Sequence, residues 1–303
     1  MNSKKRKLLI ICGPTASGKS ELAIKCARLL KSEIVYADAL DVYRGLDVGT
    51  AKPTEFEKYE IPHHLIDVVD KASMFSVGDY KELALPIIED ILSRGKTPVI
   101  CGGSGFYINS ILYDLSYGNS CANIEARKKY MALAEKYGKE YVYDVLVKVD
   151  PVSAVKLHPN DLKRVVRALE IYESGYKKSD LTDVFTPVYD YSAYALNYDR
   201  DELYARIDAR VDKMIENGLV DEVKNLIAEG VTINNQCMQG IGYKEIYTFL
   251  IGNCNLADAI SQIKLNTKHY AKRQITFFKR LKGLIWVKPE NFDKLAERIV
   301  DNL

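Results

Sequence analysis

The sequence predicts an α/β protein in which helices cover a parallel sheet, with an all-helical insertion and a helical C-terminal part. Three observations support this fold class. Short apolar runs alternate with amphipathic helical patterns over the first 115 residues, a charged helical stretch without a strand pattern follows, and a strand pattern returns near residue 191. Strands that alternate with helices favour a right-handed parallel sheet covered on both faces.

The first element is a buried strand. Residues 8–12 form a continuous apolar run with β-branched side chains, which is typical of a strand covered on both faces. A glycine-containing turn follows, and residues 21–30 then show apolar positions at helical spacing. The apolar run is too short to span a bilayer or to form a secretory core, so we expect a cytoplasmic protein without a membrane segment.

The same pattern repeats along the first third of the chain. We expect a strand at 33–37, a helix at 76–92 and a third strand at 97–101. Ser76 and Asp79 are spaced as a capping box at the start of the helix.

The rest of the chain is mostly helical. We expect helices within 123–174, a strand at 191–198, helices at 201–227 and 257–281, a short strand at 284–287 and a final amphipathic helix. These elements define the expected organisation: 1–115 as the first part of the core, 116–190 as the insertion, and 191–303 as the second part of the core with basic helices.

Composition excludes several classes of protein. Of 303 residues, 43 are Lys or Arg and 41 are Asp or Glu, so the net charge of +2 excludes a whole-surface polycation. Hydrophobic residues make up 47%, which argues against global disorder. Six cysteines, Cys121 among them, form no CxxC pair and no His/Cys cluster. We therefore expect free thiols in a reducing compartment rather than a zinc site.

A phosphate-binding loop follows the first strand. Its residues fit the pattern GxxxxGK[ST]: Gly13, Pro14, Thr15, Ala16, Ser17, Gly18, Lys19 and Ser20. A strand before the loop and a helix after it place backbone N–H groups and a helix N-terminus around a phosphate, which makes the core of P-loop type. Lys19 is expected to reach the terminal phosphate, and Ser20 to offer its hydroxyl to Mg²⁺. The alternative is a glycine-rich turn that binds nothing.

Polar side chains follow the next two strands. Asp38 comes after the second strand, and Ser104 comes after Gly102-Gly103 at the end of the third. Ligands of open α/β sheets bind beyond the carboxyl ends of the strands, so we expect both residues to face the same crevice as the loop. Asp38 then acts as a carboxylate near magnesium, as a general base or as a helix cap.

Eight stretches, in order and over almost the whole chain, make the sequence recognisable. They are GPTASGKS (13–20), YRGLDVGTAKP (43–53), IPHHLIDV (61–68), GGSGFYI (102–108), HPNDLKRVVRALEIYESG (158–175), GLVDEV (218–223), IGYKEI (241–246) and YAKRQITFFKR (270–280). Together they resemble the tRNA dimethylallyltransferases, also called tRNA isopentenyltransferases.

The resemblance implies a reaction. The family transfers a dimethylallyl group from dimethylallyl diphosphate to N6 of the adenosine at position 37, just 3′ of the anticodon, in tRNAs that read codons beginning with U. It implies that the phosphate loop holds the donor diphosphate, and that Lys19 and Mg²⁺ stabilise this leaving group. It assigns Asp38 as the proton acceptor and Ser104, where Thr is usual, as a hydroxyl near the diphosphate or nucleotide. It also implies a monomer.

The resemblance further implies a set of residues that meet the tRNA anticodon stem-loop. The set is Asp38, Ala39, Leu40, Asp41, Ser104, Arg127, Lys163, Arg164, Val165, Val166, Arg167, Lys268, Lys272, Arg273 and Gln274. Two members depart from the family pattern, because Ala39 and Asp41 stand where Ser and Gln are usual. The insertion is expected to clamp the anticodon loop.

A basic stretch supports an RNA partner independently. No acidic residue lies between Asp258 and Glu290, whereas eight basic residues do, and Lys264, Lys268 and Lys272 recur on one helix face. Three alternatives stay open at this point: a kinase of P-loop type, a prenyltransferase of free adenine nucleotides, and an RNA-binding module with a degenerate site.

Overall fold

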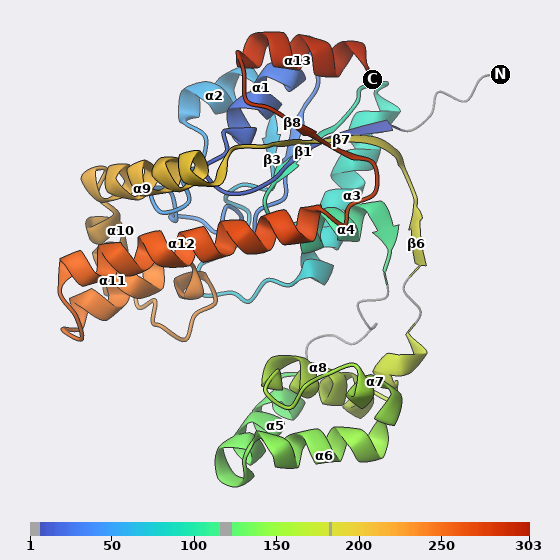
Figure 1. Ribbon diagram of the computed structural model, residues 1–303, viewed down its shortest axis with the longest axis vertical. Coiled ribbons are helices and arrows are strands. Elements are labelled where there is room, and N and C mark those ends of the chain that lie inside the picture. The colour runs from blue at the N-terminus through green and yellow to red at the C-terminus, as the bar shows by residue number, and fades with distance from the viewer. Residues whose placement is uncertain (1–6, 116–122, 182–183) are drawn as a thin grey trace. The chain divides into compact units, whose positions relative to one another are not determined.

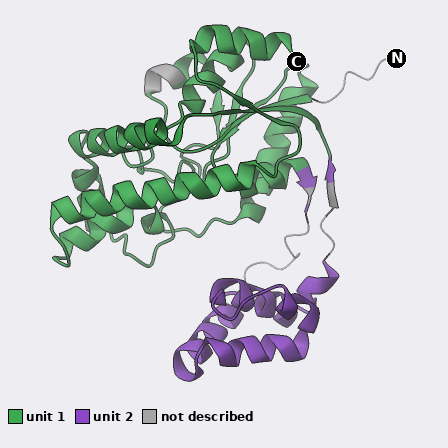
Figure 2. Ribbon diagram, viewed as in Figure 1, with its two compact units in different colours: residues 1–112, 188–303 green, residues 113–187 purple. Residues whose placement is uncertain are grey.

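The computed structural model describes residues 7–115, 123–181 and 184–303 (Figure 1). It forms two compact units (Figure 2). Unit 1 comprises Met1–Leu112 and Val188–Leu303, and unit 2 comprises Tyr113–Pro187. The insertion was expected at 116–190. Cys121 lies outside the described residues.

Unit 1 is built on a parallel sheet. Six strands of the described chain form it in the order β3-β2-β4-β1-β7-β8, and all five pairs are parallel. The strands are β1 Lys7–Cys12, β2 Ile34–Tyr36, β3 His63–His64, β4 Val99–Gly102, β7 Asp190–Leu196 and β8 Leu284–Val287. The predicted parallel α/β core is therefore confirmed, although the two-residue strand β3 is too short to give a sequence pattern.

Helices cover both faces of this sheet. They are α1 Lys19–Leu30, α2 Glu55–Glu60, α3 Val77–Ser93, α4 Gly105–Leu112, α9 Arg200–Glu216, α10 Leu219–Ala228, α11 Tyr243–Leu250, α12 Leu256–Phe278 and α13 Phe292–Asp301. Figure 1 shows α1 and α13 on one side of the sheet and α3, α4 and α12 on the other. None of the described helices is long and apolar enough to cross a bilayer.

Local signals decide where several of these helices begin. Ser76 Oγ accepts a hydrogen bond from Asp79 N–H at 3.2 Å, and the Asp79 carboxylate accepts one from Ser76 N–H at 2.7 Å, so the predicted capping box is present. The single helix expected at 201–227 is two helices, α9 and α10. Gly218 separates them with φ 95°, a left-handed conformation that interrupts a helix and favours glycine.

The core of unit 1 lies between the sheet and its helices. Leu9 and Ile11 of β1 are fully buried against Leu22 of α1 and Leu295 of α13. Each fully buried leucine contributes about 1.5–3 kcal/mol relative to an exposed one. This packing fixes the strand ends from which the loops of the site arise.

Unit 2 is helical except for one ribbon. Its α-helices are α5 Ile124–Tyr137, α6 Lys139–Val149, α7 Pro151–Val155 and α8 Leu162–Glu173, and β5 Tyr113–Asp114 pairs antiparallel with β6 Val184–Pro187. This ribbon was not predicted from the sequence. Tyr130, Val142, Leu146 and Leu169 belong to a separate core within the unit.

Candidate active site

The phosphate loop lies where the sequence predicts it, between β1 and α1. Its backbone needs left-handed conformations at Ala16, with φ 61°, and at Gly18, with φ 87°. A Cβ at Gly18 would lie 2.9 Å from the Phe292 ring, so a side chain there would also clash. The loop ends at the first turn of α1, where unpaired backbone N–H groups favour an anion.

Side chains from two distant helices hold this loop. Gln274 of α12 accepts a hydrogen bond from Thr15 N–H at 2.9 Å. Arg206 of α9 donates to the Ala16 carbonyl at 2.9 Å and stacks on the Tyr198 ring at 4.7 Å. The loop conformation is therefore set by tertiary contacts as well as by its glycines.

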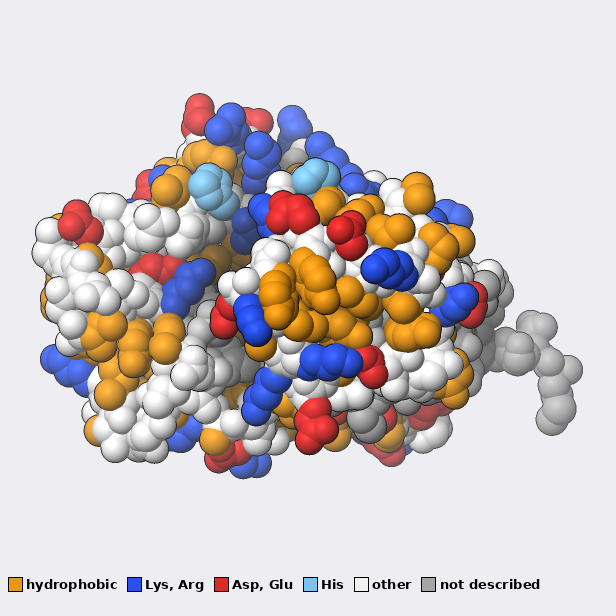
Figure 3. Space-filling view, turned by 90° about the horizontal axis from the view of Figure 1, so that it is seen from below, with side chains coloured by type: hydrophobic (Ala, Val, Ile, Leu, Met, Phe, Trp, Pro, Cys, Tyr) orange, Lys and Arg blue, Asp and Glu red, His pale blue; other side chains and the backbone are white. Residues whose placement is uncertain are grey.

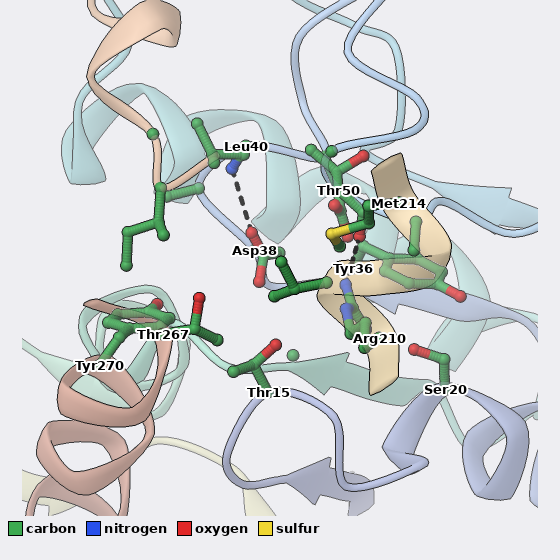
Figure 4. A pocket seen from close by; sticks show the side chains of 18 of the residues that line it. Thr15, Ser20, Tyr36, Asp38, Leu40, Thr50, Arg210, Met214, Thr267 and Tyr270 are labelled. Atoms are coloured by element: carbon green, nitrogen blue, oxygen red, sulfur yellow. Dashed lines mark hydrogen bonds between the residues drawn. The ribbon is translucent and has the colours of Figure 1, made fainter. Parts of the chain in front are cut away.

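The loop after β2 carries Asp38. Asp38 Oδ1 accepts a hydrogen bond from Leu40 N–H at 3.1 Å (Figure 4). Ser104, just after β4, accepts one from Ala39 N–H through its Oγ at 3.1 Å and donates its own N–H to the Ala37 carbonyl at 3.0 Å. The structure thus brings Asp38 and Ser104 together, with Ser104 holding the loop that carries Asp38.

These loops surround a cavity of about 370 Å³. Its lining includes Thr15, Lys19, Ser20, Asp38, Ala39, Leu40, Asp41, Thr50, Arg210, Met214, Lys244, Thr267, Tyr270 and Arg273. Figure 4 shows Thr267 and Tyr270 of α12 on one side of the cavity and Arg210 and Ser20 on the other. The phosphate loop and the Asp38 loop therefore face one space.

Burial and charge perturb the ionisable groups in this cavity. Burial raises the pKa of Asp41 well above its usual value, and the neighbouring Asp38 carboxylate raises it further, against the influence of Lys19 and other cations. Burial lowers the pKa of Arg210, an effect that Asp41 and Asp38 oppose. Burial, then Asp38, raises the pKa of Tyr270, so its hydroxyl stays neutral. Such perturbed groups in a cavity mark candidate functional residues.

Another part of the cavity wall is fixed by a carboxylate that binds backbone amides. Glu222 of α10 accepts hydrogen bonds from the N–H groups of Asp47, Val48 and Gly49, at 2.8, 2.7 and 3.1 Å. Tyr243 donates its hydroxyl to the same carboxylate at 2.7 Å. A Cβ at Gly49 would lie 2.6 Å from the Tyr243 side chain, which explains the glycine.

This fixed turn in turn positions a cation. The Thr50 carbonyl, next in the chain, accepts a hydrogen bond from Arg210 at 2.8 Å. Arg210 is thereby held in the cavity together with Lys19 and Ser20.

The basic residues of α12 fall into two groups. Lys264 and Lys268 form ion pairs with Asp212 and Asp208 of α9, at 2.6 and 2.8 Å. Lys272 and Arg273 are exposed, and in the part of the chain that the structure describes neither has an ion pair. Lys272 and Arg273 can therefore bind a polyanion without first losing an ion pair.

The predicted RNA residues of unit 2 are also divided. Val165 and Val166 are buried in its core, so they support α8. Arg127 and Arg167 form ion pairs with the buried carboxylate of Glu170, at 3.0 and 2.8 Å.

Two further basic residues of unit 2 lie at the surface. Arg164 is two-thirds exposed and lies 3.4 Å from Asp161, and Lys163 is exposed. On the face seen in Figure 3, basic side chains are interspersed with acidic and apolar ones.

Two arginines of the site were not identified from the sequence. Arg206 and Arg210 lie four residues apart, as do Asp208 and Asp212. In a helix this spacing puts the arginines on one face and the aspartates on another, and this is the signal that could have identified them. No group of three His, Cys, Asp or Glu side chains suited to a metal is present among the described residues.

The family is decided by comparison with known proteins. The protein-family model described as IPP transferase matches residues 41–281 of this chain. The chain belongs to the IPP transferase family. The family resemblance and the fold predicted from the sequence are both confirmed.

Relatives named tRNA dimethylallyltransferase match this IPP transferase over nearly its full length. The protein of Alkaliphilus oremlandii is 45% identical over 302 residues, covering 98% of this chain and 96% of its own. That of Acetivibrio thermocellus is 42% identical over 300 residues, with the same two coverages.

Solved structures agree with these matches. The tRNA isopentenylpyrophosphate transferase of Bacillus halodurans superposes with a TM-score of 0.74 at 40% identity, covering 98% of this chain and 95% of that one. A eukaryotic dimethylallyltransferase described as acting on tRNA gives a TM-score of 0.81 at 30% identity, covering 97% of this chain and 77% of that one.

Proposed function

We propose that this chain transfers a dimethylallyl group from dimethylallyl diphosphate to N6 of adenosine 37 in tRNAs that read codons beginning with U. One observation carries the proposal: a single cavity is lined by the phosphate loop with Lys19 and by the carboxylate of Asp38. The family and its tRNA-acting relatives support the acceptor.

The phosphate loop is proposed to hold the leaving group. When the bond between the allylic carbon and the diphosphate oxygen breaks, the electron pair leaves with the diphosphate and negative charge builds up there. Lys19 and Arg210 both line the cavity, and cations held in place before the reaction stabilise such charge efficiently. Arg210 needs no rearrangement for this role, because the Thr50 carbonyl already orients it.

Magnesium fits the same place. The Ser20 hydroxyl lines the cavity at the first turn of α1, and together with diphosphate oxygens and water it forms the oxygen ligand set that Mg²⁺ prefers. Ser20 would hold the ion, which when bound neutralises charge on the leaving diphosphate.

The acceptor side is proposed to use Asp38. As the bond from N6 to the allylic carbon forms, N6 gives up a proton, and the Asp38 carboxylate takes it. Ser104 accepts a hydrogen bond from Ala39 N–H and also hydrogen-bonds to the Tyr270 side chain, so its hydroxyl is held close to where the nucleotide and the diphosphate are proposed to lie. The products are N6-dimethylallyladenosine in tRNA and diphosphate.

Two exposed basic regions are proposed to bind the tRNA anticodon stem-loop. They are Lys272 with Arg273 on α12, and Lys163 with Arg164 at the start of α8. Arg273 also lines the cavity, so it connects a phosphate-binding surface to the site of chemistry. The target base has to leave the anticodon stack to enter the cavity, which costs a few kcal/mol. We further propose that the chain acts as a monomer, as the family resemblance implies.

The decisive experiment supplies labelled dimethylallyl diphosphate and Mg²⁺ with three acceptors. These are unmodified tRNA, the same tRNA with guanosine at position 37, and free AMP. We expect label on the unmodified tRNA alone. Label on AMP would favour a prenyltransferase of free nucleotides, and ATP-dependent phosphorylation without prenyl transfer would favour a kinase.

The RNA surface of unit 2 can be tested by salt titration. We expect Lys163→Gln with Arg164→Gln to weaken tRNA binding and to make the plot of log affinity against log salt shallower by about 0.7–0.9 per lost phosphate contact. Lys148→Gln, an exposed lysine on α6 of the same unit, is the matched control. Salt titrations of the double variant that superimpose on those of the wild type would exclude both residues from the RNA surface.

A further inference from the structure

Gln274 was expected at the RNA surface, yet its side chain is only 4% exposed. Its carboxamide lies between the phosphate loop after β1 and the turn after β4 that carries Ser104. Oε1 accepts the hydrogen bond from Thr15 N–H at 2.9 Å, and Nε2 donates to the Gly103 carbonyl at 3.0 Å. Thr15 follows β1 and Gly103 follows β4, which are neighbouring strands of the sheet.

The contact requires an amide at this position. One partner is a donor and the other an acceptor, so the bridging group must offer one acceptor and one donor side by side, as a carboxamide does. A Cβ on Gly103 would lie 2.3 Å from Gln274 Nε2, so the glycine is needed for the amide to reach its carbonyl. The bridge therefore fits both partners closely.

The bridge extends to the proposed base. The residue after Gly103 is Ser104, which accepts the hydrogen bond from Ala39 N–H next to Asp38. Contacts thus run without a gap from the phosphate loop through Gln274 and Ser104 to the Asp38 loop. The preceding residues on α12, Lys272 and Arg273, are exposed instead, and Arg273 also lines the cavity.

We infer that Gln274 is a positioning residue, which fixes the phosphate loop relative to the turn that carries Ser104, and that it does not contact RNA. This inference rests on the proposed function. It also commits Thr15 N–H to Gln274, so the diphosphate is bound by other groups, Lys19 and Arg210 among them.

Two variants of similar size test the inference. Gln274→Met removes both hydrogen bonds. Gln274→Glu keeps an acceptor for Thr15 but faces the Gly103 carbonyl with a carboxylate, whereas a protonated glutamic acid again offers one donor and one acceptor. Thr276→Val, an exposed position on the same helix, is the matched control.

The readouts are the affinity for inorganic diphosphate with Mg²⁺, measured by calorimetry, and the KM values for dimethylallyl diphosphate and tRNA. At pH 8 we expect both Gln274 variants to lose about tenfold in diphosphate affinity, while tRNA affinity stays within about twofold of the wild type. As the pH is lowered towards 6, the loss of diphosphate affinity in Gln274→Glu should become smaller, because protonation restores a donor at this position. The loss in Gln274→Met should not change.

Each diphosphate affinity is divided by that of the wild type at the same pH, so that the titration of other groups around residue 274 cancels. The charged groups on the neighbouring elements are present in both proteins, among them Lys19 of α1, Asp38 and Asp41 after β2, Arg206 and Arg210 of α9, and Lys272 and Arg273 of α12. Recovery of Gln274→Glu at low pH also shows that this variant folds.

Opposite results would overturn the inference. Weaker tRNA binding with unchanged diphosphate affinity would make Gln274 an RNA contact. If the loss of diphosphate affinity in Gln274→Glu does not change with pH, position 274 does not need a donor and an acceptor side by side. The proposed function can fail separately. If the wild-type protein binds diphosphate as expected but transfers no dimethylallyl group to tRNA, the proposed reaction is wrong, while the positioning role of Gln274 still stands.

Discussion

The carboxylates at the two ends of strand β2 have pKa values shifted in opposite directions. Glu33, just before the strand, is buried and surrounded by basic side chains: Arg94 binds it with two nitrogens, Lys96 lies at 2.9 Å and His64 Nε2 at 2.9 Å. Arg94 in particular holds the pKa of Glu33 well below its usual range. At the other end, Asp41 lies beside Asp38 in the cavity, and its pKa is raised.

The difference shows how this fold separates stability from activity. At the Glu33 end the cations satisfy the carboxylate, and the cluster joins β2 to the segment before β4. At the Asp38 end two carboxylates share one cavity, an arrangement that costs stability and that proteins tolerate where chemistry needs it. Substitutions at the two ends should therefore affect different measurements.

The largest expected effect is that of Asp38→Asn on turnover. The amide keeps the size of the side chain but cannot take a proton, so the single-turnover rate should fall by about 10²–10⁴-fold. Diphosphate affinity and thermal stability should stay close to the wild type. A variant with a near-normal rate would exclude Asp38 as the proton acceptor.

Glu33→Gln should give the converse result. Loss of hydrogen bonds to charged partners is expected to lower the free energy of unfolding by about 1.5–3 kcal/mol, with activity per folded molecule unchanged. Urea unfolding and active-site titration measure the two quantities. Reduced activity at full stability would mean that the two ends of the strand are not independent.

The smallest expected effect is a change in the pH dependence of stability. The raised pKa of Asp41 means that the folded state holds its proton more tightly than the unfolded state, so this contribution is lost as pH rises through the raised value. Asp41→Asn should therefore gain stability relative to the wild type between acidic and neutral pH. The lowered pKa of Glu33 has the opposite sign, so the deficit of Glu33→Gln should shrink as pH falls below the ordinary Glu value of about 4.3.

Thermal unfolding between pH 3 and pH 8 measures both trends. Parallel curves for the wild type and Asp41→Asn would mean that Asp41 titrates as an ordinary surface carboxylate.

The parts of the site that are local in sequence could be predicted. The phosphate loop, the capping box at Ser76 and the position of Asp38 after a strand all depend on residues within a few positions of one another, so their patterns can be read directly. The parallel direction of the strands followed from the alternation of strands and helices, whereas their order in the sheet did not follow from the sequence.

The residues that were missed or misplaced depend on distant contacts. Gln274 reaches Thr15 across 259 positions, and Arg210 reaches Thr50 across 160. The periodicity of α12 does not distinguish a buried polar side chain such as that of Gln274 from an exposed one on the same helix. The ion pairs of Lys264 and Lys268 with α9 were missed for the same reason.

Unit 2 leaves and rejoins the core at neighbouring points. The last residue before it, Leu112, accepts a hydrogen bond through its carbonyl from Val188 N–H at 2.9 Å, directly after it. Strands β5 and β6 form the ribbon next to this junction. The hydrogen bond between Val188 and Leu112 and the pairing of β5 with β6 hold the two ends of unit 2 together. A longer or shorter segment between them therefore changes the loop-closure entropy of the chain only slowly with its length.

The sheet and its cavity are therefore expected to keep their fold when the segment between β5 and β6 changes in length, because the strand ends that carry the site are held by contacts within unit 1.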